Sequence, residues 1–379
     1  MKIDQIKIMH IIETLDAGGA EKVLVDIVNH LPEEFESIVC CLKTSGIMAH
    51  RFVKNNLKII ELNKRNGNDF KLVFKLRHLL VKHEIDVVHA HNWNTFCESI
   101  LACILSKGSK RIIHTIHGYH FDYPNSLYGQ FKKRIRHFIE KLLSFRSYKI
   151  CTVSNEIKRY IENEIQIKGS KIEVVLNGID VDADAPYSIS TSVINNKNNF
   201  FSLCFVGRLA VVKNLYTLLN AMKIIRKSIS SIRLFIVGDG PERISLEAYA
   251  QEIGIDDCVI FLGYRDDVKS ILRSMDVLIL PSFYEGISVA LLEAMSCGRP
   301  VIASQVGGNV ETVIHNETGL LFPPRDINAL AECVIELYSN PELCHRMGRN
   351  AKTRARKNFN IKTTIIQYVE LYTDRLSLF

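Results

Sequence analysis

The strongest constraint on the fold is an alternation of short apolar runs with longer segments of helical periodicity, which occurs twice along the chain. Strands that alternate with helices at this spacing predict a parallel sheet covered by helices on both faces. In the first half, we expect helices over 19–31, 70–83, 94–106 and 126–146. The expected strands are Ile6–Ile12, Ser37–Leu42, Lys58–Leu62, Asp86–His89, Arg111–His117, Tyr148–Val153 and Ile172–Leu176.

The alternation stops in a polar segment rich in Asn and Ser, over 182–200, and then resumes. The expected strands of the second half are Phe201–Val206, Ile232–Val237, Cys258–Leu262, Val277–Leu280 and Pro300–Ala303. A chain of 379 residues is long enough for two domains with separate cores. The sequence therefore predicts an α/β protein with two doubly wound, Rossmann-like domains, over 1–190 and 191–357. A C-terminal helix over 358–379 is expected to cross back to the first domain.

The segment 281–304 places two carboxylates, Glu285 and Glu293, on either side of a glycine and an apolar run. If a helix begins near Gly286, Glu285 lies at its start and Glu293 lies about two turns inside it. An anion would then meet the exposed N–H groups of Gly286, Ile287, Ser288 and Val289. This arrangement suits a sugar joined to a diphosphate, and the alternative is a solvated junction between a loop and a helix.

Two basic residues follow the first strand of the second half. The apolar run ends in Gly207-Arg208, and Lys213 follows on the same loop. Both cations can reach one diphosphate from this position, where they would stabilise charge that develops on a leaving group. Either residue alone would be read as a solvated surface charge.

Together these motifs resemble the retaining glycosyltransferases of the GT-B fold, in particular the large family four. The resemblance runs in order from Gly18 to Gly319. The matching elements are Gly18-Gly19-Ala20-Glu21, Gly207-Arg208 with Lys213, Val237-Gly238-Asp239-Gly240, Leu262-Gly263, Pro281-Ser282 with Glu285-Gly286, Glu293-Ala294-Met295, Gly298-Arg299-Pro300-Val301, Gly307-Gly308 with Glu311, and Thr318-Gly319.

The resemblance implies a GT-B architecture with two domains that face each other across a cleft. It also implies an enzyme that moves a hexosyl or N-acetylhexosaminyl group, with retention, from a nucleoside-diphosphate sugar to a saccharide. A UDP-sugar is favoured over a GDP-sugar as the donor. The favoured acceptor is a lipid-linked saccharide of bacterial surface polysaccharide or lipopolysaccharide biosynthesis. No cofactor and no metal ion are expected, because cationic side chains replace the ion.

The resemblance also assigns roles to residues. Arg208 and Lys213 would stabilise the departing diphosphate, Glu285 would orient the sugar, and Glu293 would hold the ribose. His117 matches the histidine that contacts the transferred sugar, and His91 is a second candidate for that side of the site. The loop of Gly18 and Gly19 would approach the donor diphosphate or the acceptor. Tyr264 falls where the family cradles the nucleobase.

Two patterns could suggest a metal, and we interpret neither as a metal site. Five histidines that cluster in the first half, His89, His91, His114, His117 and His120, have no acids or Cys pair nearby to complete a ligand set. The run Asp180-Val-Asp182-Ala-Asp184 contains the DxD pattern of metal-dependent transferases. Its place at the domain junction indicates a hinge.

Three other functions compete with glycosyl transfer. A phosphorylase or a nucleotide-sugar epimerase would share the architecture, although no lysine in a pyridoxal-phosphate setting is identifiable. A non-catalytic binding partner would be expected to lack the basic and acidic residues noted above. A Rossmann oxidoreductase is disfavoured, because Gly18-Gly19 does not have the full GxGxxG spacing.

The net charge of +7 comes from the first half, where residues 1–179 hold 27 Lys and Arg against 19 Asp and Glu. The segment 131–149 is strongly basic, and its apolar residues recur at spacings of four and three, as on one face of a helix. Two interpretations fit this pattern: an ordinary amphipathic helix packed on the sheet, or a helix that also rests on the anionic headgroups of a membrane. No nucleic-acid partner is expected. The apolar residues are Phe131, Ile135, Phe138, Leu142 and Phe145.

Other features of the chain predict where it works. No apolar run approaches the roughly 18 residues that span a bilayer. The first residues resemble a strand rather than a signal peptide. The ten cysteines are scattered without metal-ligand pairs, as free thiols in a reducing compartment would be. We therefore expect a cytoplasmic protein at the inner face of the plasma membrane.

Overall fold

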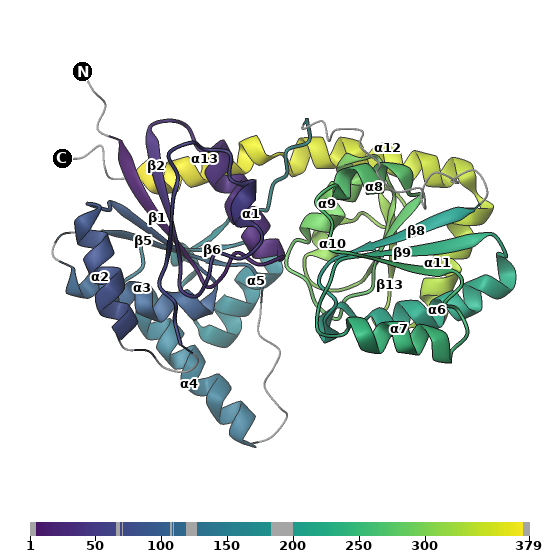
Figure 1. Cartoon of the computed structure of the whole chain (residues 1–379), viewed down its shortest axis with the longest axis horizontal. Helices are drawn as coiled ribbons and strands as arrows, with labels where there is room; N and C mark the ends of the chain where they lie inside the picture. The colour runs from purple at the N-terminus through teal and green to yellow at the C-terminus, as the bar shows by residue number, and fades with distance from the viewer. Residues whose placement is uncertain are drawn as a thin grey trace. The chain divides into compact units, whose positions relative to one another are not determined.

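The computed structural model describes residues 5–65, 69, 71–106, 108, 110–118, 127–182 and 200–373. The chain forms two compact units (Figure 1). One consists of Met1–Asn177 with Ile361–Phe379, and the other of Gly178–Asn360. The predicted boundary between residues 190 and 191 lies outside the described residues.

The first unit is built on a parallel sheet with the strand order β3-β2-β1-β4-β5-β6-β7. Every strand predicted for this half is present, with ends that move by at most two residues. The strands are β1 (Ile6–Ile12), β2 (Phe35–Cys41), β3 (Lys58–Glu61), β4 (Val87–His91), β5 (Arg111–Ile116), β6 (Lys149–Thr152) and β7 (Ile172–Val174).

Helices cover both faces of this sheet. Met9 and Ile11 of β1 pack with residues of α2 (Lys71–Lys82) and α3 (Trp93–Leu105). On the opposite face, His10 of β1 lies beside Tyr372 of α13 (Ile361–Thr373), which itself packs against α1 (Gly19–His30). The alternation of side chains along a strand accounts for the two faces. The remaining α-helices of the described residues in this unit are α4 (Leu127–Ser144) and α5 (Asn155–Tyr160).

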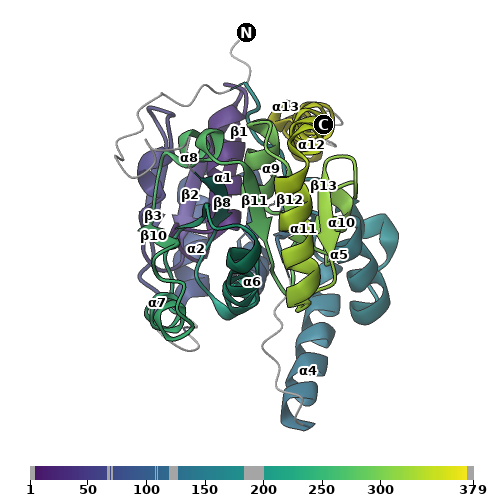
Figure 2. The ribbon, with the colours of Figure 1, turned by 90° about the vertical axis from the view of Figure 1, so that its right-hand side faces the viewer.

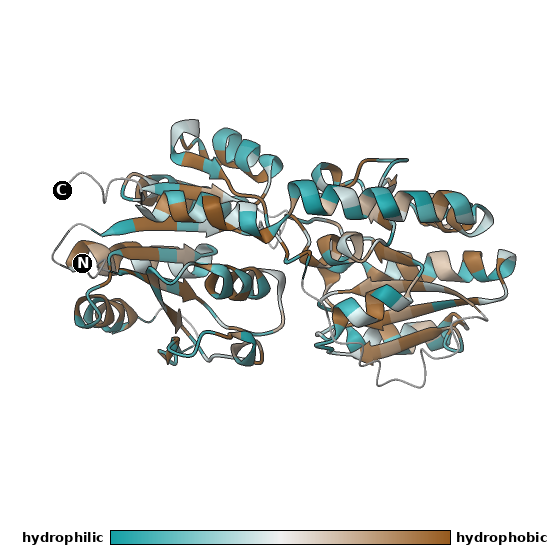
Figure 3. Cartoon of the chain, turned by 90° about the horizontal axis from the view of Figure 1, so that it is seen from above, coloured by the Kyte–Doolittle hydropathy of each residue, from teal (hydrophilic) through white to brown (hydrophobic). Residues whose placement is uncertain are grey.

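The second unit repeats the arrangement with the strand order β10-β9-β8-β11-β12-β13. Its strands are strongly apolar, as Figure 3 shows, and the central ones are buried on both faces. One of them, β13, was not predicted. The strands are β8 (Phe201–Val206), β9 (Ile232–Val237), β10 (Val259–Gly263), β11 (Val277–Leu280), β12 (Val301–Ser304) and β13 (Gly319–Phe322).

Helices also surround the second sheet (Figure 2). They are α6 (Leu215–Ser228), α7 (Arg243–Glu252), α8 (Val268–Ser274), α9 (Val289–Ser296), α10 (Asn309–Thr312), α11 (Ile327–Ser339) and α12 (Pro341–Asn358). A single 3-10 turn, Val211–Lys213, connects β8 to α6. Within the described parts of the chain, we find no helix with the length and apolarity to cross a membrane.

The two strand orders position the predicted site residues. In each sheet the chain runs outward from a central strand and then returns to its other side, so that β1 neighbours β4 and β8 neighbours β11. Loops that leave such adjacent carboxyl ends form the binding edge of a doubly wound sheet. Arg208, Lys213 and Glu285 follow β8 and β11, whereas Gly18, Gly19 and His91 lie at the ends of β1 and β4. The predicted α/β fold with two doubly wound sheets is confirmed.

Candidate active site

A partly buried ion pair lies at the carboxyl edge of the second sheet. Lys213 Nζ is 2.6 Å from Glu285 Oε1, and Ser282 Oγ donates a second hydrogen bond of 2.6 Å to the same oxygen. Glu285 is only 8 % exposed and Ser282 is fully buried, so the carboxylate depends on these donors rather than on water. No residue within the described ranges donates to Glu285 Oε2. That oxygen can accept a hydrogen bond from a ligand.

Backbone contacts hold the two loops of this pair together. Phe283 N donates to Val212 O at 2.8 Å, and Asn214 Nδ2 donates to Pro281 O at 3.0 Å. Asn214 has a φ of 52°, in the left-handed region that asparagine tolerates, and it ends the 3-10 turn that presents Lys213. The position of Lys213 relative to Glu285 is therefore fixed by the loops as well as by charge.

Two adjacent glycines support the loop that carries Glu285. A Cβ atom on Gly308 would lie 1.9 Å from Gly286 O, and one on Gly307 would lie 2.0 Å from Glu285 O. Gly308 N also donates to Glu285 O at 3.0 Å. The backbones approach so closely that only glycine fits, which explains the Gly307-Gly308 motif.

Arg208 lies on the same loop as Lys213. Its side chain is exposed, and it forms no hydrogen bond or ion pair with a residue that the structure describes. The backbone on either side is held against the loop after β9, because a Cβ on Gly238 would lie 1.9 Å from Gly207 O, and Leu209 N donates to Asp239 O at 2.9 Å. A guanidinium on a fixed backbone, with no partner in this part of the chain, is suited to bind an anion.

The predicted start of the helix near Gly286 is wrong. Helix α9 begins at Val289, and Ser288 precedes it with an extended ψ of 120°. Gly286 and Ile287 instead form a bend packed against the backbone of Gly308. The N–H groups at the helix start therefore belong to residues 288–291, which include only Ser288 and Val289 of the predicted four. Glu293 lies in the second turn of α9 and is 4 % exposed.

Tyr264 and the Asp180 motif also have defined surroundings. Tyr264 is half-buried after β10, and its hydroxyl donates to Asp266 Oδ1 at 3.0 Å. The Asp180 carboxylate accepts a hydrogen bond of 3.0 Å from the backbone N–H of Asp182, which is an Asx turn. This contact gives the Asp180–Asp182 pair a structural role at the crossover between the units, and Asp184 lies outside the described residues.

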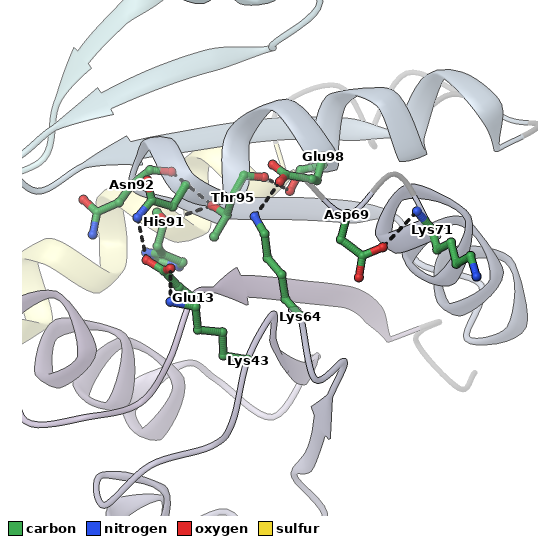
Figure 4. A network of polar contacts seen from close by, with 11 residues as sticks. Glu13, Lys43, Lys64, Asp69, Lys71, His91, Asn92, Thr95 and Glu98 are labelled. Atoms are coloured by element: carbon green, nitrogen blue, oxygen red, sulfur yellow. Dashed lines mark hydrogen bonds and ion pairs between the residues drawn. The ribbon is translucent and has the colours of Figure 1, made fainter. Parts of the chain in front are cut away.

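In the first unit, histidines form a hydrogen-bonded chain. His91 Nε2 is 3.4 Å from His10 Nδ1, and His91 Nδ1 is 3.1 Å from His117 Nε2. Next to this chain, Thr95 Oγ1 donates to His91 O at 2.8 Å, and Lys43 pairs with Glu13 at 2.8 Å (Figure 4). The structure thus brings the two predicted histidines, His91 and His117, into contact.

Burial keeps these imidazoles neutral. It lowers the pKa of His10 to about 3 and that of His117 to about 4, and it lowers the pKa of His91 well below its usual value. A neutral ring has one donor and one acceptor nitrogen, so the hydrogen bonds that link these histidines can run in either of two directions. In one of them His117 Nδ1 carries a proton, and in the other it is an acceptor. His117 Nδ1 is buried and has no hydrogen-bond partner in the described part of the chain, so its capacity as a donor or an acceptor is unused.

One ring nitrogen from each of His10, His89 and His91 lies within 4.8 Å of the other two, as metal ligands do. Both nitrogens of His89 are already bonded, at 2.7 Å each, to Tyr372 Oη and Thr115 Oγ1. Those of His91 bond to the neighbouring histidines. Of the six ring nitrogens, only His10 Nε2 has no hydrogen-bond partner among the described residues, and the other five are already used. This supports the interpretation that these residues do not form a metal site. His120 lies outside the described residues.

Gly18 and Gly19 stand at the start of α1. Gly18 precedes the helix and Gly19 is its first residue. A Cβ on Gly19 would meet nothing within 4 Å, whereas one on Gly18 would lie 2.1 Å from the Glu21 carboxylate. An approaching phosphate would thus find open space at Gly19 and an acid beside Gly18. Their role as a ligand loop stays a prediction.

Sequence reasoning missed three residues of these networks: Ser282, Asn214 and His10. Ser282 stood in a matching motif, but nothing in the sequence indicated that it donates to Glu285. His10 lies within an apolar strand, and its contact with His91 depends on the pairing of β1 with β4. The pairing follows from the sheet topology, which a motif does not encode.

Two family models match the chain, one on each half. Glycosyltransferase Family 4 matches residues 17–183, and Glycosyl transferases group 1 matches residues 190–354. The chain is 29 % identical over 385 residues to the UDP-Gal:alpha-D-GlcNAc-diphosphoundecaprenol alpha-1,3-galactosyltransferase of Escherichia coli. That alignment covers 98 % of this chain and 97 % of the relative.

Solved structures share the fold. HepE of Anabaena in complex with UDP-glucose superposes with a TM-score of 0.83 at 20 % identity, over 98 % of this chain and 100 % of that one. WaaG, a glycosyltransferase involved in lipopolysaccharide biosynthesis, gives a TM-score of 0.77 at 17 % identity. That comparison covers 97 % of this chain and 99 % of WaaG.

Because its buried histidines are neutral, we predict that the first unit loses stability in acid. Burial lowers the pKa of His114 to about 3 in the folded protein, below the value of 6.5 for an exposed histidine. Unfolding lets the ring bind a proton below that value, so stability is full above pH 6.5 and falls as the pH drops toward 3. Each such histidine contributes a slope of about 1.4 kcal/mol per pH unit.

His114→Leu should remove the contribution of one histidine to the pH dependence of the free energy of unfolding. Neither nitrogen of His114 makes a hydrogen bond of ordinary geometry with a described residue, so the substitution should change the free energy of unfolding by less than about 1 kcal/mol near pH 7.5. Urea titrations at about pH 7.5 and about pH 5.5, followed by the fluorescence of Trp93, the single tryptophan of the chain, test this. An unchanged acid slope in the variant would contradict the assignment.

Proposed function

The chain belongs to the GT-B-fold glycosyltransferases, and from this premise we propose that it is a retaining enzyme that uses a UDP-sugar and a lipid-linked saccharide acceptor. Its relatives include enzymes of polysaccharide and lipopolysaccharide biosynthesis. The name of the Escherichia coli relative states a UDP-Gal donor and a diphosphoundecaprenol-linked acceptor, and HepE is solved with UDP-glucose. Both support the proposed substrates. The transferred group is a hexosyl or N-acetylhexosaminyl unit.

The observation that carries the proposal is the Lys213–Glu285 pair with Arg208 on the same loop. In transfer, the bond between the anomeric carbon and the diphosphate oxygen breaks, and a bond to the acceptor hydroxyl forms. Arg208 and Lys213 stabilise the charge that moves onto the diphosphate, and a diphosphate oxygen accepts the proton of the acceptor. Glu285 orients the donor sugar through Oε2. These cations supply the charge stabilisation that a metal ion supplies in other transferases.

The remaining assignments complete the donor and acceptor sides. Glu293 binds the ribose hydroxyls, the N–H groups of Ser288 and Val289 bind phosphate oxygens, and Tyr264 borders the nucleobase. In the first unit, His117 contacts the transferred sugar through Nδ1, and His91 positions the His117 ring through their 3.1 Å hydrogen bond. Gly18 and Gly19 allow a phosphate to approach the backbone.

The main alternative is a non-catalytic protein with the same fold. A binding partner without turnover would not need a buried carboxylate held by a lysine and a serine, because such a charge is costly to bury. The assembled pair therefore favours an enzyme. The excess positive charge of residues 1–179 supports the proposal that the enzyme is cytoplasmic and acts at the inner face of the plasma membrane.

We predict turnover of a UDP-sugar without added metal and with retention of the anomeric configuration. Purified protein should be screened with UDP-sugars and GDP-sugars on a lipid-linked saccharide, with EDTA present throughout. NMR of the product should show the anomeric configuration of the donor. Inversion, or activity that EDTA abolishes and Mn²⁺ restores, would refute the proposed chemistry.

We also predict that Gly308→Ala lowers kcat/KM for the donor by at least about tenfold, since the new methyl group must displace the Glu285 loop. Gly348→Ala is a control of similar steric cost, because its Cβ would lie 2.2 Å from Gly298 O and would not meet the Glu285 loop. Both variants should melt at a lower temperature. Only the Gly308 variant should lose activity when assayed well below its melting temperature, and equal losses would show that the loop geometry is not specific to the site.

A further inference from the structure

Helix α4 turns its apolar side outward. Six large apolar residues recur along it and the following turn with spacings of three and four, and each is 44–66 % exposed. We name them the α4 ridge: Tyr128, Phe131, Ile135, Phe138, Leu142 and Phe145. They form one stripe about 25 Å long. The arrangement with this stripe packed on the sheet, which the sequence left open, is wrong.

The opposite side of α4, which faces the rest of its unit, is mostly polar, with Leu143 as an apolar exception. Lys133 Nζ lies 3.4 Å from Glu164 Oε2, and His137 Nε2 lies 3.1 Å from Tyr160 Oη. Arg136 stacks over the Trp93 ring at 4.8 Å. Glu140, on the same side, is 3 % exposed. Leu143 packs against the hydrophobic core of the unit, but the other contacts that hold α4 are charged and polar. An ordinary surface helix instead buries its apolar stripe.

Figures 1 and 2 show α4 extending away from the sheet of its unit. Isolated apolar residues on a surface need no explanation, but a continuous ridge of this kind marks a contact with an apolar partner. Phe74 on α2 is 63 % exposed and stands outside this stripe. It lies on another helix and therefore serves as a comparison residue of similar exposure.

Charges beside the ridge indicate the partner. Lys132, Arg134 and Arg146 are exposed, and no acidic residue lies within 131–139. Lys132 Nζ lies over the Tyr128 ring at 4.4 Å, at one end of the ridge. A second copy of the chain would bring like charges together across a two-fold interface, which is unfavourable. Anionic headgroups above an apolar layer match both the cations and the aromatic side chains.

We propose that the α4 ridge inserts into the interface of an anionic lipid bilayer, with Lys132, Arg134 and Arg146 at the headgroups. This inference rests on the proposed function in one respect: membrane binding would bring the enzyme to a lipid-linked acceptor. Lys133 and Arg136 contribute little to membrane binding, because they already contact Glu164 and Trp93. Penetration by aromatic residues, rather than charge alone, holds the protein on the membrane.

The test is co-sedimentation with vesicles of phosphatidylcholine, with and without about 30 % phosphatidylglycerol, in the absence of any donor or acceptor. Wild-type protein should bind the anionic vesicles and retain part of this binding when salt is raised from about 0.1 to about 0.5 M. The triple variant Phe131→Ser, Phe138→Ser, Phe145→Ser should bind at least about tenfold more weakly. Phe74→Ser, of similar exposure, should bind as wild type does.

The charged residues are tested in the same assay. Replacing Lys132, Arg134 and Arg146 with Gln should weaken binding to anionic vesicles only, whereas the same change at the exposed Lys71 and Lys82 of α2 should have little effect. Far-UV circular dichroism shows whether each variant is folded. Turnover on a water-soluble saccharide acceptor should be the same in the triple variant and the wild type.

Three results would overturn the inference. They are absence of binding to either vesicle, equal binding by the triple variant, and a wild-type dimer that the triple variant converts to a monomer. The last would assign the ridge to a second copy of the chain. None of these depends on transfer, so loss of the proposed activity with normal vesicle binding would contradict the proposed function alone.

Discussion

The hydrogen-bonded contact between Lys213 and Glu285 is the interaction on which the proposed site depends. Removing Lys213 alone is costly, because it leaves the buried Glu285 charge without its partner. The second unit contains several devices that keep this pair in place. Ser282 adds a second donor, Asn214 links the two loops, and Gly307-Gly308 lets the backbone pack directly against Glu285. A site held in this way is preorganised for charge that develops during transfer.

The two units offer different chemistry at equivalent edges of their sheets. The second presents fixed charges, with Arg208, Lys213 and Glu285 after β8 and β11. The first presents neutral imidazoles, because burial holds the pKa of His117 at about 4 and that of His91 well below its usual value. A diphosphate needs cations, whereas sugar hydroxyls are well served by neutral donors and acceptors. This division agrees with the proposed assignment of diphosphate to the second unit and of sugar contacts to His117.

Much of the fold followed from the sequence, because buried strands of a parallel sheet are continuous apolar runs. The strands Phe201–Val206 and Ile232–Val237 match their predicted ends. Strand β13 escaped prediction, since its four residues lie among turns and resemble the end of a loop. The start of α9 was misplaced, because the bend at Gly286 is imposed by contact with Gly308, far along the chain.

The candidate site was predictable as a set of residues but not as a set of contacts. Arg208, Lys213, Glu285 and His117 were identified by motifs, whereas the 2.6 Å contact of Lys213 with Glu285 requires the neighbouring positions of β8 and β11. The direction of the α4 ridge was likewise undecided in the sequence. The helical pattern shows which residues share a face, but the contacts of Lys133, Arg136 and His137 decide that this face points outward.

Binding of UDP, measured by isothermal titration calorimetry, tests the central claim most directly, because it requires neither the acceptor nor the sugar. Lys213→Met with Glu285→Gln removes both charges and leaves no buried ion, so the double variant should fold. We predict that its dissociation constant for UDP rises at least about tenfold, or about 1.4 kcal/mol. Lys223→Met, at an exposed position of α6, should bind as wild type does. Wild-type affinity for UDP in the double variant would contradict the account, because the diphosphate would then lie elsewhere.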